Sequence, residues 1–201
     1  LRDHQGQTAL YYATSDDVTE TLLRAGADPE TRGALEAHLL DAVMQGDVAN
    51  LEIFLARIGD DTSGLNKHDD SGFTLVHWAL DTSVECLRLL LRARADPDAK
   101  DGSGWTPLHW AVEGYTESVE ALLEGGANPN VVDCSGETAL HYAAAKYPES
   151  VRLLVEAGAD LSVTDGTGST ATDLAKAAGC AASVEYLSSG TGPLVKAARS
   201  S

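Results

Sequence analysis

Basic residues are scarce in this chain of 201 residues, which has 14 Lys and Arg against 31 Asp and Glu. The formal net charge of -17 repels phosphate backbones and anionic lipid head groups. We therefore expect no nucleic acid partner, and a basic protein surface fits better. Long apolar runs are also missing. Since about 20 apolar residues are needed to cross a bilayer, we expect no direct membrane insertion.

Cysteine is rare and widely spaced. The three cysteines, Cys86, Cys134 and Cys180, lack the close spacings that bring thiolates together on zinc or in a redox pair. We expect buried thiols in a reducing compartment, and therefore an intracellular protein, most simply a cytoplasmic one, with the nucleus or an organelle interior left open. The opening residues, LRDHQGQ, have no signal-peptide character. Because they also lack Met and start within a repeated unit, we expect the chain to be part of a longer one.

A repeated hexapeptide organises the chain. The segments TLVHWA, TPLHWA, TALHYA and TATDLA follow each other at a constant spacing of 32 residues, and TALYYA is an earlier copy; they start at Thr74, Thr106, Thr138, Thr170 and Thr8. An Asp stands five residues before each Thr, and a Gly stands two before it. This regular punctuation indicates a stack of similar units.

Each unit predicts two short helices. The D-x-x-G segment supplies turn residues, and the following Thr suits the N-cap of a helix. After a break, Val119, Leu122 and Leu123 recur at helical spacing, and Gly126 suits a left-handed helix end. Since neither helix is long enough to be stable alone, the units must stack on their neighbours.

These motifs resemble those of ankyrin repeats, in which T-P-L-H-x-A opens the first helix of a 33-residue unit. The segments LLRAGADP, LLRARADPD, LLEGGANPN and LVEAGADL recur in register with it, so the resemblance covers about residues 3–190, or about six repeats. It implies a mainly α fold, an ankyrin-repeat α-solenoid with short β-hairpin turns between helix pairs. It also implies a protein-interaction module that is not an enzyme.

The departures from the family pattern set the expected boundaries. Three units have 32 residues because the turn between their helices lacks one, and Arg94 replaces the helix-ending Gly in one of them. A loop centred near residues 59–66 is expected to protrude. The expected units are a truncated repeat (1–31), an atypical repeat with a longer loop at 56–68 (32–68), three regular repeats (69–100, 101–132, 133–164), a capping repeat (165–190) and a flexible tail (191–201).

The spacing of the candidate residues gives little support for a metal or catalytic site. His77, His109 and His141 recur at one repeat position, but stacked helices lie about 8 to 10 Å apart. Nitrogens that share one zinc ion lie within about 4 Å of each other. We expect each imidazole to join its own Thr to a neighbouring hairpin instead, as the resemblance implies. The acidic segment starting at Asp96 fails as a calcium loop, because its twelfth position is Pro107. No metal, cofactor or catalytic residue is predicted.

Aromatic residues concentrate in the three regular repeats. By the resemblance, hairpin and first-helix positions line or border the concave groove that holds partners. Packing within the array is an equally open interpretation for the residues that follow His, whereas Trp105 is expected to be exposed at a turn tip. No Lys or Arg occurs between Asp101 and Ala145, which favours a partner with a basic, Arg-containing segment. The candidate partner-binding residues are Phe73, Trp78, Trp105, Trp110, Glu113, Tyr115, Glu137, Tyr142 and Tyr147.

The expected function is that of a scaffold or adaptor that binds a protein partner through this surface. Two alternatives stay open: a regulatory region of a larger enzyme or channel, and a fixed structural subunit of a large assembly. Asn130 lies in LLEGGANPN, a context like that of ankyrin asparagines hydroxylated by a dioxygenase, and this modification is a further open possibility.

Overall fold

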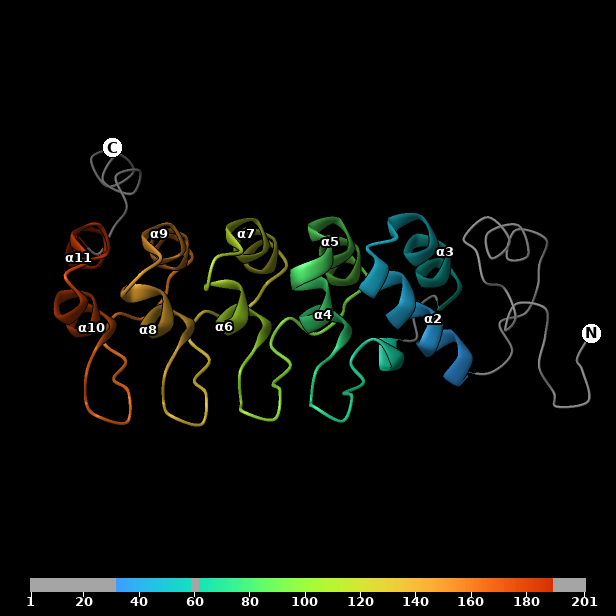
Figure 1. The fold of residues 1–201 in the computed structure, drawn as a ribbon, viewed down its shortest axis with the longest axis horizontal. Helices are drawn as coiled ribbons and strands as arrows, with labels where there is room; N and C mark the ends of the chain where they lie inside the picture. Colours follow the sequence, from blue (N-terminus) through green and yellow to red (C-terminus); the bar gives the residue numbers. More distant parts are fainter. Residues whose placement is uncertain (1–31, 59–61, 190–201) are drawn as a thin grey trace, which may run out of the picture.

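The computed structural model describes residues 32–58 and 62–189 as a row of paired helices joined by projecting loops (Figure 1). The predicted first repeat (1–31) and the tail (191–201) lie outside these residues. The helices are α2 (Arg32–Gln45), α3 (Val48–Ile58), η1 (Thr62–Gly64), α4 (Leu75–Thr82), α5 (Val84–Arg92), α6 (Pro107–Ala111), α7 (Thr116–Glu124), α8 (Ala139–Ala144), α9 (Pro148–Glu156), α10 (Ala171–Ala178) and α11 (Ala181–Ser189).

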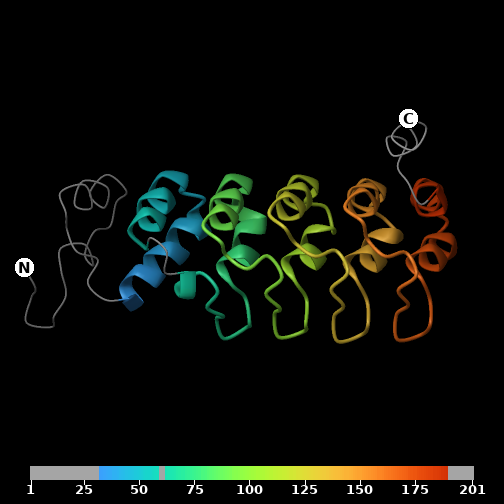
Figure 2. The same ribbon diagram turned by 180° about the vertical axis from the view of Figure 1, so that it is seen from behind.

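The helices form two layers. The first helix of each pair packs against the first helix of the next, and the second helices do the same. The loops between pairs extend from one edge of the array, as the view from behind also shows (Figure 2). In the described residues of these loops, each of which ends in a tight turn before the next first helix, isolated bridges occur only from Val132 to Thr138 and from Thr164 to Thr170. The predicted α-solenoid is confirmed, and its hairpins are short.

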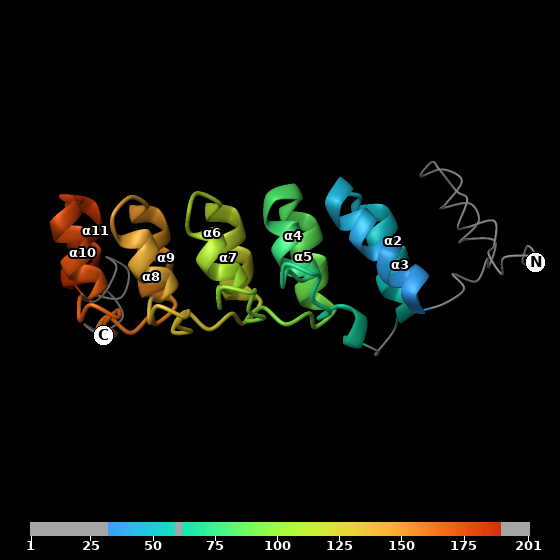
Figure 3. The same ribbon diagram turned by 60° about the horizontal axis from the view of Figure 1, so that its bottom comes forward.

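The two ends of each helix pair differ. From α4 on, the first helix starts at a hairpin loop and ends at the short connection to the second helix, so these connections lie at the end of the pair opposite the hairpins (Figure 3). None of the helices in the described residues has the length and apolar character needed to span a membrane.

Threonine starts the first helices as expected. Thr74, Thr106, Thr138 and Thr170 each occupy an N-cap with extended backbone, and each forms a capping box with the side chain three residues later. The second helices are amphipathic, with α5 burying Cys86, Leu87 and Leu90 on one side. Local caps therefore start helices that are too short to persist without the packing of the array.

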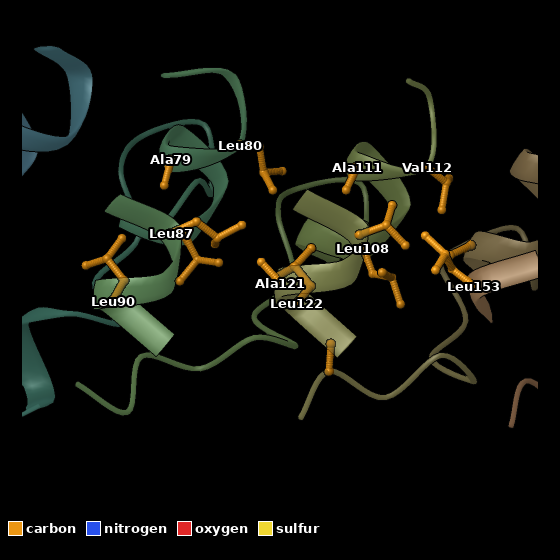
Figure 4. Packing of buried hydrophobic residues seen from close by; sticks show 14 of the residues in the cluster. Ala79, Leu80, Leu87, Leu90, Leu108, Ala111, Val112, Ala121, Leu122 and Leu153 are labelled. Carbon is orange, nitrogen blue, oxygen red and sulfur yellow. The ribbon is translucent and has the colours of Figure 1, made fainter. Parts of the chain in front are cut away.

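Small and branched residues fill the space between the layers. Ala79, Ala111 and Ala143 on the first helices are fully buried, and Leu87 and Leu122 on the second helices pack against this layer (Figure 4). Alanine lets the helices approach closely, while leucine fills the space between neighbouring pairs. The core is thus continuous along the described array.

Two expectations were wrong in part: a protruding loop near residues 59–66, and three buried thiols. The loop after α3 forms the short helix η1 and buries Leu65, which is 1% exposed, so this part of the loop is anchored; residues 59–61 lie outside the described residues. Of the three thiols, only Cys86 is buried. Cys134 is exposed because it occupies the hairpin turn, and Cys180 is half-exposed at the connection before α11.

Arg94 adopts a conformation that normally selects glycine. Its φ of 65° is the same left-handed turn that Gly126 and Gly158 make at the equivalent positions. The helix end closes in the usual way, because the Arg94 and Ala95 amides donate to the Leu91 and Leu90 carbonyls at 3.0 Å. A side chain here costs about 1 kcal/mol of backbone strain.

We predict that Arg94→Gly raises the free energy of unfolding by about 1 kcal/mol, because glycine removes the left-handed strain. Urea unfolding monitored by circular dichroism measures it. The reverse change, Gly126→Arg, is the matched control and should destabilise by a similar amount, since a Cβ there meets nothing within 4 Å and strain is its only effect. Equal stability of all three proteins would contradict the prediction.

Candidate partner-binding surface

The turn aspartate of each hairpin organises the loop and a neighbouring side chain. One oxygen of Asp101, Oδ1, accepts the backbone N–H groups of Ser103 and Trp105 at 2.8 and 2.9 Å. Asp69, Asp133 and Asp165 bind the equivalent amides in their own hairpins. This Asx arrangement fixes the turn and leaves the second oxygen, Oδ2, to bind other donors.

The second oxygen holds an aromatic residue of the first helix. Trp78 Nε1 donates to Asp69 Oδ2 at 3.1 Å, and Trp110 Nε1 donates to Asp101 Oδ2 at 3.0 Å. In the next repeat, the Tyr142 hydroxyl donates to Asp133 Oδ2 at 2.7 Å. The aromatic side chain that follows His is therefore fixed to the turn of its own repeat.

The aromatic rings form a continuous line across three repeats, which we call the aromatic ladder: Phe73, Trp78, Trp105, Trp110 and Tyr142. The hairpin residue Phe73 packs between Trp78 and Trp110, with centroid distances of 5.5 and 5.7 Å and nearly perpendicular planes. One repeat on, Trp105 packs between Trp110 and Tyr142 at 4.9 and 4.5 Å. Each hairpin ring thus contacts the first-helix ring of its own repeat and of the next.

Among the turn aspartates, Asp133 binds the most side chains of the ladder. It is only 9% exposed, and Trp105 Nε1 joins Tyr142 in donating to its Oδ2, at 3.1 Å. Burial acts to raise the pKa of Asp133, but hydrogen bonds from Tyr142, from the Glu137 and Ser135 amides and from Trp105 lower it below the usual range. Burial and the bonds to Asp133 and Glu137 raise the pKa of Tyr142. The ladder therefore rests on an ionised aspartate at neutral pH.

The histidine beside the ladder fastens adjacent repeats. His109 is 1% exposed, and its Nδ1 accepts from the Thr106 amide at 3.1 Å and pairs with the Thr106 hydroxyl at 2.8 Å. Its Nε2 donates across the repeat boundary to the Glu137 carbonyl at 3.2 Å. His77 makes the same pattern with Thr74 and the carbonyl of Trp105. The expected structural role is confirmed for these two histidines.

His141 completes only half of this pattern. Its Nδ1 binds Thr138, but its Nε2 has no partner in the described part of the chain. In the last repeat Asp173 replaces the histidine, and its carboxylate accepts from the amide and hydroxyl of Thr170. Within residues 32–58 and 62–189, no group of three or more His, Cys, Asp or Glu is placed to hold a metal ion.

The nine candidate residues form two groups and one exception. The first group is the aromatic ladder with Glu137, the second is Tyr115 with Glu113, and Tyr147 is the exception. Glu137 joins the aromatic ladder by accepting from Tyr142 at 3.0 Å. Tyr115 lies at the other end of the helix pair, where it donates to Asp81 at 3.1 Å; that bond first, and the nearby charge of Glu113 to a smaller extent, raise its pKa. Tyr147 is half-buried and packs against the core.

Exposure separates the candidates further. Tyr115 and Trp110 are 43% and 37% exposed, which makes them the most accessible rings of the set. Trp105 is half-buried, so the expectation of an exposed tryptophan at a turn tip was wrong. Its ring is covered by Trp110 and Tyr142, and its N–H is bound by Asp133. Trp105 therefore supports the array as well as the surface.

Comparison with known families covers most of the chain. The sequence model for three copies of the ankyrin repeat matches residues 39–133 and 114–197, and the model of a single ankyrin repeat matches residues 5–34. The chain belongs to the ankyrin-repeat family. A search of curated proteins finds no match.

Ankyrin repeats are protein–protein interaction modules without catalytic function of their own, and they are common in intracellular proteins. In this ankyrin array, the turn aspartates have a second role that was not predicted from the sequence. A usable signal was present, because an aromatic residue stands nine positions after Asp69, Asp101 and Asp133. At this spacing, the aromatic side chain of the first helix donates a hydrogen bond to the turn aspartate of its own repeat.

We predict that His109→Ala lowers the free energy of unfolding by about 3 kcal/mol at pH 8, because it leaves Thr106 and the Glu137 carbonyl without their partner. Burial lowers the pKa of His109 below its usual value of about 6.5. As the pH falls through 6.5, the unfolded chain takes up a proton that the folded chain resists, so the wild type loses stability. The alanine variant lacks this loss. Its deficit should therefore be smaller at pH 5.5 than at pH 8, and a deficit that does not change with pH would contradict the neutral imidazole.

We also predict that Trp105→Phe, which keeps a ring but removes the N–H donor to Asp133, lowers the free energy of unfolding by about 1.5 kcal/mol. Trp110→Phe is the matched control. It removes the same kind of bond to Asp101 at a more exposed position and should cost about 0.5 kcal/mol. Chemical unfolding of the two variants tests this order, and a larger loss for Trp110→Phe would show that Asp133 is not the main anchor.

Proposed function

We propose that this ankyrin array is a scaffold or adaptor that binds a protein partner through the aromatic ladder and the acidic residues beside it. The main support for this proposal is that five aromatic rings in three successive repeats are held in fixed positions by packing and by carboxylates. Such a surface loses little side-chain entropy on binding. Tryptophan and tyrosine are also the preferred anchors of protein interfaces.

A partner with a basic segment fits the charge of this surface. Trp110 and Glu113, three residues apart, are both exposed, and the segment from Asp101 to Ala145 carries no Lys or Arg. An arginine or lysine of the partner would contact both the ring faces and the carboxylates. The same charge argues against nucleic acid as the partner.

The ladder ends in a recess beside α2. Phe73 and Trp78 line a cleft of about 240 Å³ together with Leu40 of α2 and Lys67 and His68 of the loop. An apolar side chain of the partner would fit between these rings. The proposed binding surface therefore runs from this cleft along the hairpins and first helices to Tyr142.

A reducing intracellular compartment, most simply the cytoplasm, fits a chain whose described cysteines are free thiols. We propose no enzymatic activity for the array itself. Membership of a larger complex, or of a longer protein that contains an enzyme or channel, agrees with the same surface, which would then bind another part of that assembly.

We predict that Trp110→Ala weakens partner binding at least tenfold, because it removes the most exposed ring of the ladder. A photo-crosslinking amino acid at position 113 identifies the partner, and isothermal titration with the purified partner measures the affinity. Trp110→Tyr copies the Tyr142 arrangement and should keep the melting temperature near that of the wild type. A change of affinity in this variant would therefore reflect binding and not loss of folding.

Met44→Ala is the control for surface hydrophobicity, because Met44 is 50% exposed on α2 and lies outside the ladder. This variant should bind the partner with wild-type affinity. Unchanged affinity of Trp110→Ala, or an equal loss in Met44→Ala, would place the binding surface elsewhere.

A further inference from the structure

A cleft lies away from the ladder, between the helix connections of two neighbouring repeats. It has a volume of about 410 Å³ and is lined by residues 80–84, at the α4 to α5 connection, and by residues 114–118, at the α6 to α7 connection. These connections lie at the end of the helix pairs opposite the hairpins (Figure 3). Of the nine candidate residues, only Tyr115 lines this cleft.

A buried hydroxyl without a partner lines this cleft. Ser118 is 1% exposed, and its Oγ has no hydrogen-bond partner in the described part of the chain. The equivalent residue one repeat later, Ser150, donates to the carbonyl of Val112 in the preceding repeat at 3.2 Å. The corresponding acceptor for Ser118 is the carbonyl of Leu80, another cleft residue, and that bond is not made. A buried hydroxyl that can both donate and accept is therefore left unused at the cleft.

The cleft is also acidic without a compensating cation. Asp81 and Glu117 line it, and Tyr115 donates to one oxygen of Asp81. None of the lining residues, all of which the structure describes, is Lys or Arg. The next connection differs at this point, because Lys146 stands where Gly114 stands here. The connection next to Ser150, which forms its hydrogen bond, thus carries Lys146. The connection next to Ser118, which lacks that bond, carries no Lys or Arg.

We propose that this cleft binds an arginine side chain of the protein partner. The guanidinium group pairs with Asp81 and Glu117, lies against the exposed ring of Tyr115 and donates an N–H to Ser118 Oγ. Arginine fits better than lysine because its planar group presents several donors at once and stacks on aromatic rings. The proposal rests on the proposed function for the source of the side chain, and it adds a second contact at the far end of the helix pairs.

The probe for this site is N-acetyl-arginine amide, titrated into the ¹⁵N-labelled chain and followed by NMR. We expect saturable shifts of amide signals in residues 80–84 and 114–118. The double variant Asp81→Asn, Glu117→Gln should bind the probe at least tenfold more weakly while its melting temperature stays near that of the wild type. Ser118→Ala should weaken binding about threefold without loss of stability, whereas Ser150→Ala, the matched control, should lower stability and leave binding unchanged.

Three results would overturn the proposal: no saturable shifts, equal binding of N-acetyl-citrulline amide or N-acetyl-lysine amide, or equal shifts at residues 146–150, which would indicate unspecific attraction to an acidic protein. Trp110→Tyr keeps the cleft intact and should bind the arginine probe with wild-type affinity. A failure of the ladder as the partner surface and a failure of the arginine site are therefore seen in separate experiments.

Discussion

The carboxylate of the turn aspartate is the interaction on which the described array depends. One oxygen closes the hairpin through two backbone amides, and the other fixes the aromatic side chain of the first helix. In Asp133 the second oxygen also binds Trp105 of the preceding repeat, so a single carboxylate joins a turn, a helix and a neighbouring unit. Because its hydrogen bonds offset the burial that would raise its pKa, the group stays ionised while only 9% exposed.

Coupling between repeats is local and passes through a few polar groups in addition to the apolar core. His77 and His109 reach the backbone of the next hairpin, and the hairpin rings Phe73 and Trp105 pack against the next first helix. Since each repeat interacts with its neighbours alone, stability is approximately a sum of repeat and interface contributions. This polar coupling weakens toward the last repeat. His141 has no cross-repeat acceptor in the described part of the chain, and in the last repeat Asp173 replaces the histidine.

Sequence periodicity was enough to predict the helices and their Thr caps, because each of these depends on residues within one repeat. The role of the histidines was predicted from the resemblance to ankyrin repeats. The burial of Trp105 was not predictable in the same way. It depends on how far one repeat is rotated against the next, and that rotation decides whether an indole meets Asp133 or solvent. Ser118 and Ser150 make the same point, since identical residues at equivalent positions differ in whether the cross-repeat hydrogen bond forms.

The exposure of carboxylates and aromatic rings along the array favours one part of it for a cationic partner. Asp133 already accepts four hydrogen bonds and is only 9% exposed, so little of its capacity is left for a new ligand. Asp69, Glu113 and Glu117 are exposed, and Trp110 and Tyr115 have the most accessible rings of the candidate set. A basic segment would therefore find its strongest contacts around α4, α6 and the start of α7. The rings near Asp133 would mainly hold that surface in place.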